Sequence, residues 1–156
     1  MINLRKENGI AVEGDNGSLV LNCTDTPLHH WILTNNGFEA RFNVNQLNFE
    51  PAILIRGNLI FIGVEQGIFV LDTSNNRVIS EISDASNVQW IDEDAQEYVV
   101  FAAEDEVITL DDFGMLLWRI NLPDVIEMTN VVNGNVLVTG LSGEEYKLNL
   151  TDGSSA

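Results

Sequence analysis

The chain has 156 residues, of which 45% are hydrophobic, and it carries seven Lys and Arg against 24 Asp and Glu, for a net charge of −17. At this length one folded domain is expected, because such a chain buries roughly 70% of the surface that it exposes when unfolded. The charge argues against nucleic acid and anionic membranes as partners, since both bind through basic patches. It would instead attract a cationic partner and raise its association rate, although acidity can also serve solubility alone.

Residues 1–9 lack the apolar core of a secretory signal, and no apolar run approaches the ~20 residues that span a bilayer. The single cysteine, Cys23, excludes an internal disulfide and a cysteine-based zinc cluster. These observations lead us to expect a cytoplasmic protein.

Short apolar runs alternate with turn signals along the whole chain, and none has the periodicity of a long amphipathic helix. In chain order, we expect a strand at residues 2–6, another at 17–22, and an extra hairpin or irregular insertion at 34–44. Later runs rich in β-branched and aromatic residues, as strands are, occupy residues 59–64, 68–71, 98–101 and 136–138. Asn-Gly and Asp-Gly dipeptides between the runs favour tight hairpin turns.

The sequence repeats itself with a period of about 38 residues, which is most evident when residues 58–82 are aligned with 97–120. Ile60 then falls on Val99, and Ile62 falls on Phe101. An Asp or Asn occupies one equivalent position in every copy, at Asn22, Asp72, Asp111 and Asn149, with intervals of 50, 39 and 38 residues. We therefore divide a single domain into four units at about residues 1–50, 51–85, 86–123 and 124–156.

A unit of about 38 residues with four strands has the size of a propeller blade. The pattern resembles blades of the WD40 and quinoprotein types, in which a strand ends in Leu-Asp and a turn leads to an outer strand. The segment from Gly114 to Trp118 resembles the Gly-x-x-x-Trp ending of quinoprotein blades, although Ser80 replaces the Trp in the second unit. The Gly-His and Trp-Asp dipeptides of WD40 repeats are missing.

We therefore expect an all-β fold of about four antiparallel, four-stranded, blade-like units. The units could close into a small ring, with the strand at residues 2–6 completing the last blade. They could also form an open half-propeller, which would leave sheet edges that need cover.

No motif in the sequence indicates catalysis, a metal or a cofactor. His29 and His30 are adjacent, so on a strand they point to opposite faces and cannot chelate together. Residues 72–76 offer alternating oxygen ligands but lack the glycine and the closing Glu of a calcium loop. Nucleophile elbows and phosphate-binding loops are also missing. We expect a protein that is not an enzyme.

The acidic residues follow the repeat, because the turn between the second and third strands of each unit carries acids. In a blade array these turns emerge on one face, where the predicted partner-binding residues are Glu65, Asp84, Glu104, Asp105, Glu106, Glu144 and Glu145, with residues 13–15 at the corresponding turn of the first unit. A second acidic group at the opposite end of the third unit comprises Asp92, Glu93, Asp94, Glu97, Asp111 and Asp112. Turns in an acidic protein are often acidic without a binding role, so both interpretations stay open.

In size, acidity and repeat pattern the chain is similar to half-propeller immunity proteins of bacterial contact-dependent growth inhibition systems, whose toxin is a ribonuclease. The resemblance implies one-to-one binding to a basic toxin nuclease domain, with a ribonuclease favoured, and blockage of its active site. It transfers no functional residue. The alternative is a generic propeller-type scaffold that holds two proteins together. A small-ligand channel is disfavoured, because Ile60, Ile62, Val99 and Phe101 look like packed core.

Overall fold

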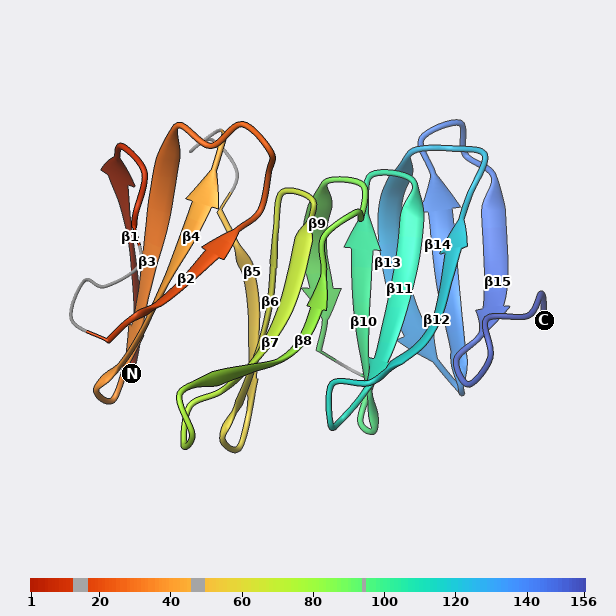
Figure 1. Ribbon diagram of the computed structural model, residues 1–156. Coiled ribbons are helices and arrows are strands. Elements are labelled where there is room, and N and C mark those ends of the chain that lie inside the picture. The colour runs from red at the N-terminus through yellow and green to blue at the C-terminus, as the bar shows by residue number, and fades with distance from the viewer. Residues whose placement is uncertain (13–16, 46–49, 94) are drawn as a thin grey trace.

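The computed structural model describes residues 1–12, 17–45, 50–93 and 95–156, and all of its regular elements there are strands (Figure 1). The first sheet contains, in spatial order, β1 (Ile2–Asn8), β3 (His29–Asn35), β4 (Phe38–Val44) and β2 (Leu19–Asn22). The second contains β5 (Ala52–Arg56), β6 (Leu59–Val64), β7 (Gly67–Asp72) and β8 (Arg77–Ile82). The third contains β9 (Val88–Asp92), β10 (Tyr98–Ala103), β11 (Glu106–Asp111) and β12 (Leu116–Asn121), and the fourth β13 (Ile126–Val132), β14 (Asn135–Gly140) and β15 (Glu145–Asn149).

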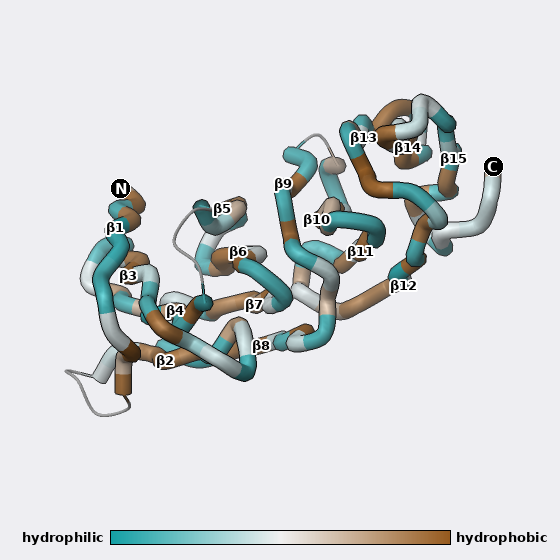
Figure 2. The backbone as a smooth tube through the Cα atoms, turned by 90° about the horizontal axis from the view of Figure 1, so that it is seen from above, coloured by the Kyte–Doolittle hydropathy of each residue, from teal (hydrophilic) through white to brown (hydrophobic). Residues whose placement is uncertain are grey.

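The four sheets fan out like the blades of a propeller and form an open arc. Seen from above, β1, β5, β9 and β13 follow one side of the arc, and β2, β8 and β12 follow the other (Figure 2). The predicted all-β, propeller-like fold is confirmed, and the ring is not closed. β1 pairs with β3, from Ile2 opposite Asn35 to Asn8 opposite His29, so the N-terminal strand belongs to the first sheet and does not complete the last one.

The first sheet departs from the repeat. Residues 34–44, expected as an extra hairpin or an irregular insertion, belong to the β3–β4 hairpin at the centre of the sheet, which Asn36 and Gly37 close with positive φ angles of 48° and 86°. β2 pairs with β4 in parallel, with Leu19 opposite Ala40, so it lies at an edge of the sheet. The repeat alignment, which matched Asn22 with the ends of β7, β11 and β15, is therefore wrong for the first unit. The chain must cross between the two edges of the sheet to pass from β1 to β2, and this crossing precludes a hairpin.

The fourth sheet has three strands instead of the expected four. Beside β15, the last residues of the chain form only an isolated bridge between Leu148 and Ser155, and Ala156 N donates to Lys147 O at 2.9 Å. Among the described residues, no helix has the length and apolar character needed to cross a membrane.

The core consists of three apolar layers, one between each pair of neighbouring sheets. The rings of Phe42 and Phe69 meet across the first layer, with centroids 5.8 Å apart. Both faces of the second and third sheets are covered, which explains why β6 and β10 are apolar without alternation. The predicted core residues Ile60, Ile62, Val99 and Phe101 are all fully buried.

Candidate protein-binding surfaces

The acidic turns lie at two opposite ends of the strands. We define the upper edge as the end with the β6–β7, β10–β11 and β14–β15 turns, at the top of Figure 1, and the lower edge as the end with the β9–β10 and β11–β12 turns. The predicted upper and lower groups of acids fall on these two edges. Residues 13–16 and Asp94 lie outside the described residues, so their predicted places remain predictions.

Backbone hydrogen bonds hold the upper-edge turns in equivalent places. Glu65 O accepts from Val88 N at 2.7 Å, and Glu104 O accepts from Ile126 N at the same distance. In both cases the donor lies at the start of the next sheet. The turns are therefore fixed to the scaffold, and the repeat alignment correctly places Glu65 and Glu104 at corresponding positions.

Glu65 and Glu104 line one hollow of about 170 Å³ at the upper edge, together with Asn87, Val88 and Gln89. Glu65 is half-buried, and its Oε2 accepts from Asn45 N at 3.1 Å. Glu104 is exposed, and its side chain has no hydrogen bond or ion pair within the described part of the chain. Of the two carboxylates, Glu104 is therefore the one presented to solvent.

An arginine from β12 pairs with two of the predicted upper-edge acids. Arg119 Nε donates to buried Glu106, and Arg119 Nη1 donates to Asp84 Oδ1 at 2.9 Å. These hydrogen bonds, the one to Glu106 above all, raise the pKa of Arg119 further above its usual range, and the bond from Arg119 holds the pKa of Asp84 below 3.8. The cluster joins β11, β12 and the connection that precedes β9, so it has a structural role.

The remaining upper-edge acids differ in exposure. Asp105 is half-buried, and its backbone N donates to Ser86 Oγ at 3.4 Å. Glu144 and Glu145 are both exposed, and Glu144 Oε2 accepts only from Tyr146 Oη, at 3.0 Å. Together with Glu104, they are the upper-edge carboxylates available to a partner.

At the lower edge, Asp111 ends β11 and caps the turn that follows it. Its Oδ1 accepts from Phe113 N at 2.9 Å and from Met115 N at 2.8 Å. Asp72 caps the turn after β7 in the same way through Ser74 N at 3.0 Å, and Asn149 caps the turn after β15. Turn capping therefore explains the Asp or Asn at three of the four recurring positions. At the fourth, Asn22 Oδ1 accepts from Asn43 Nδ2 at 2.9 Å instead.

The other lower-edge acids surround the end of the third sheet. Arg56 pairs with Asp112 and also donates to Ala95 O at 2.6 Å, which ties the second sheet to the third. Asp92 is half-buried, whereas Glu93 and Glu97 are exposed. Neither of the two exposed glutamates has a side-chain partner among the described residues.

Apolar side chains at the lower edge form a feature that the sequence did not reveal. Phe113, Met115 and Leu117 are 75%, 66% and 42% exposed. A hollow of about 470 Å³ lies beside them, lined by Glu97, Tyr98, Asp111, Asp112, Phe113 and Leu117. The sequence from Phe113 to Trp118 is rich in apolar residues, but a buried strand would have the same composition, so the sequence does not show that these side chains are exposed.

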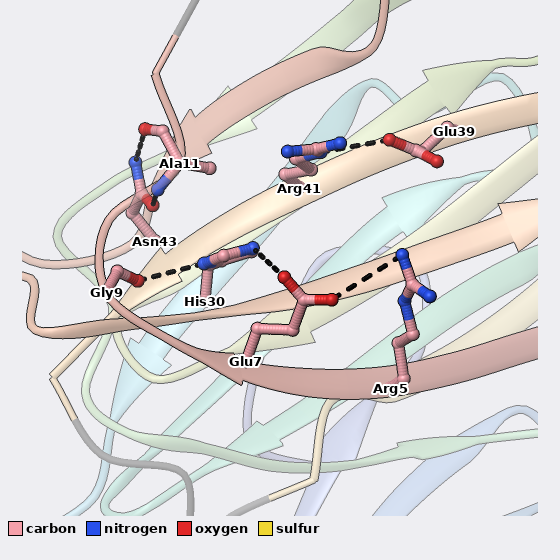
Figure 3. Close-up of polar contacts among 8 residues, drawn as sticks. All are labelled: Arg5, Glu7, Gly9, Ala11, His30, Glu39, Arg41 and Asn43. Carbon is pink, nitrogen blue, oxygen red and sulfur yellow. Dashed lines mark hydrogen bonds and ion pairs between the residues drawn. The ribbon is translucent and has the colours of Figure 1, made fainter. Parts of the chain in front are cut away.

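The outward face of the first sheet is polar, and the segment after β1 crosses it (Figure 3). His30 Nδ1 lies 2.9 Å from Gly9 O, and its Nε2 lies 3.5 Å from Glu7. Asn43 accepts from Ala11 N at 2.8 Å and donates to Ala11 O at 3.0 Å. These contacts give His30 a structural setting and cap one end of the arc, as polar terminal repeats do in other repeat proteins. The described residues contain no group of three potential metal ligands.

Similar folds occur among solved structures. The chain resembles BamB from Moraxella catarrhalis at 16% identity and a TM-score of 0.55, over 99% of this chain and 50% of that one. It resembles the computationally designed Ika4 protein at 16% identity and a TM-score of 0.56, over 73% and 74% of the two chains. A europium-containing methanol dehydrogenase gives 17% identity and a TM-score of 0.50, over 67% of this chain and 23% of that one. No protein-family model and no curated protein matches the sequence.

BamB and the methanol dehydrogenase have β-propeller-type folds, so the chain contains a propeller-like repeat. It spans half the length of the first protein and less than a quarter of the second. At these identities the likeness shows the fold alone.

Proposed function

We propose that the chain is a protein-binding module without catalytic activity that docks a basic protein partner through carboxylates at its upper edge. The observation that carries this proposal is the display of Glu104, Glu144 and Glu145 on fixed turns of two neighbouring sheets, in a chain with a net charge of −17. Preorganised carboxylates lose little conformational entropy when they pair with Lys or Arg.

In its specific form, the proposal makes the chain an immunity protein that covers the active site of a basic toxin nuclease, with a ribonuclease favoured. Nucleases bind phosphate through cationic groups, and displayed carboxylates compete for those groups. Close charge pairs in such complexes are worth about 1.5–7 kcal/mol each. The similarity in size, acidity and repeat pattern to half-propeller immunity proteins supports this form.

The test begins with capture of partners from native lysate by the tagged chain, at low and at high salt. We expect a basic protein that is released as salt is raised, because screening weakens exposed charge pairs. The captured protein is then assayed for ribonuclease and deoxyribonuclease activity, with and without the chain. Capture of a neutral protein by salt-insensitive binding would favour the generic scaffold instead.

Charge variants then locate the surface on the chain. The triple variant E104Q/E144Q/E145Q removes three exposed upper-edge charges, and E93Q/E97Q/D152N removes three exposed charges at the lower end of the strands. At low salt we expect the upper-edge variant to lower the association rate constant about tenfold, whereas the control lowers it much less. Equal effects of the two variants would show that net charge matters and that the upper edge does not.

A further inference from the structure

The lower edge carries a second surface with a different chemistry from the upper edge. The hollow beside Phe113 has apolar walls from Tyr98, Phe113 and Leu117. A neighbouring hollow of about 260 Å³ shares Glu97 and Tyr98 with it and extends over the seam between the third and fourth sheets. The two hollows thus form one elongated depression, which we call the lower groove.

The charges around the lower groove are negative. Five acids of the third unit lie at this edge, namely Asp92, Glu93, Glu97, Asp111 and Asp112, and the one cation of the unit, Arg119, lies at the upper edge. Glu97, Asp111 and Asp112 line the groove directly, and Lys and Arg are missing from the residues that line either hollow. Asp112 is paired with Arg56 and Asp111 caps a turn, so Glu97 is the lining carboxylate that is free to bind a cation.

Phe113 supplies the apolar anchor. Its side chain is 75% exposed at the tip of a turn that Asp111 holds in place through two hydrogen bonds. The two bonds fix the backbone that carries the ring, and an aromatic side chain has few rotatable bonds to immobilise when a partner covers it. The face of the ring also attracts cations. The groove therefore offers two attractions to one ligand, an apolar surface and a carboxylate beside it.

We propose that the lower groove is a separate docking surface for an extended, basic segment of a protein partner, in which Lys or Arg and apolar side chains two residues apart share the face that meets the groove. Charge complementarity selects the basic residues, and Phe113 with Leu117 receives the apolar ones. The elongated shape over the seam suits an extended segment. This inference shares one premise with the proposed function, which is that the partner is a basic protein.

The test measures fluorescence anisotropy of a short labelled peptide in which lysine, leucine and phenylalanine occupy every second position and serine fills the positions between them. Its counterpart has serine at the apolar positions. We expect the apolar peptide to bind and F113A to weaken it about tenfold, as expected for an aromatic anchor. E97Q should weaken it about threefold and reduce the dependence on salt.

Matched variants control for local disturbance and for general stickiness. Met115 lies in the same turn but outside the lining, and Leu141 is 67% exposed at the upper edge, so M115S and L141S should leave peptide binding unchanged. Tighter binding of the apolar peptide together with a selective loss in F113A supports the groove. No binding to the native chain, equal binding of both peptides, or equal loss in F113A and M115S overturns it.

The two proposals fail separately. A captured basic partner that responds to E104Q/E144Q/E145Q and ignores F113A leaves the proposed function in place and removes the lower groove. A groove that binds the peptide in a chain that captures no basic protein removes the proposed function instead.

Discussion

Asp72 shows how one side chain can both mark the repeat and contribute a pH-dependent stability. Its carboxylate accepts from Asn75 Nδ2 at 2.6 Å and from Ser74 N at 3.0 Å, and Arg77 lies 3.5 Å away. The side-chain bond from Asn75 is the largest influence that lowers the pKa of Asp72 below its ordinary value of 3.8. A lowered pKa in the folded state means that ionisation of Asp72 favours folding.

The D72N variant can still cap the turn through Oδ1, as Asn149 does at the corresponding position. It replaces the ionised oxygen that accepts from Asn75 with an amide NH2, which cannot accept that bond. The stabilisation is present above pH 3.8 and is lost as the pH falls through the lowered pKa of the folded state. We therefore expect D72N to be less stable than the native chain at neutral pH, with a difference that disappears in acid. Urea unfolding across a pH series measures it, and a difference that does not change with pH would contradict the assignment.

At the scale of elements, the buried carboxylate of Glu106 ties β11 to β12 through Arg119. The side chain of Glu106 is 1% exposed, and that of Arg119 is 31% exposed. Removal of the arginine leaves a carboxylate in the interior without its cation, which typically costs about 3–5 kcal/mol. Because Arg119 is partly exposed, we expect the lower end of that range for R119M.

Denaturant unfolding of R119M, E106Q and the double variant R119M/E106Q tests the pair. The double variant should recover part of the stability lost in R119M, since it no longer buries an unpaired charge. A loss in R119M below about 0.5 kcal/mol would show that the pair behaves like a surface ion pair.

The elements also show what the sequence can and cannot predict. The alignment of the second and third units placed Asp72 on Asp111 correctly, because turn capping and two-sided burial each demand particular residues. The first unit could not be predicted in this way. β2 has the pattern of any short strand, and only its parallel pairing to β4 reveals that it is an edge strand. The lower groove could not be predicted, because apolar residues such as Phe113 and Leu117 look the same in a sequence whether the fold buries or exposes them.

At the scale of the whole molecule, the arc is open and its charge is unevenly distributed. Arg5, Lys6 and Arg41 lie in the first sheet, whereas the third unit has one cation, Arg119, which is paired with Glu106 and with Asp84 of the second unit. The carboxylates of the third unit therefore repel one another as well as attract a partner. This repulsion opposes the compact state, and it acts mostly between exposed groups.

Salt should therefore move stability and binding in opposite directions. Between about 0.01 M and about 0.15 M ionic strength, the Debye length falls from about 30 Å to about 8 Å. Repulsion among the exposed carboxylates weakens, while the buried pair of Glu106 and Arg119 is screened much less. We expect the melting temperature to rise over this range and the association rate of a basic partner to fall. Calorimetry and stopped-flow mixing in the same buffers measure the two quantities. A melting temperature that falls with salt would mean that exposed ion pairs outweigh the repulsion of a chain with a net charge of −17.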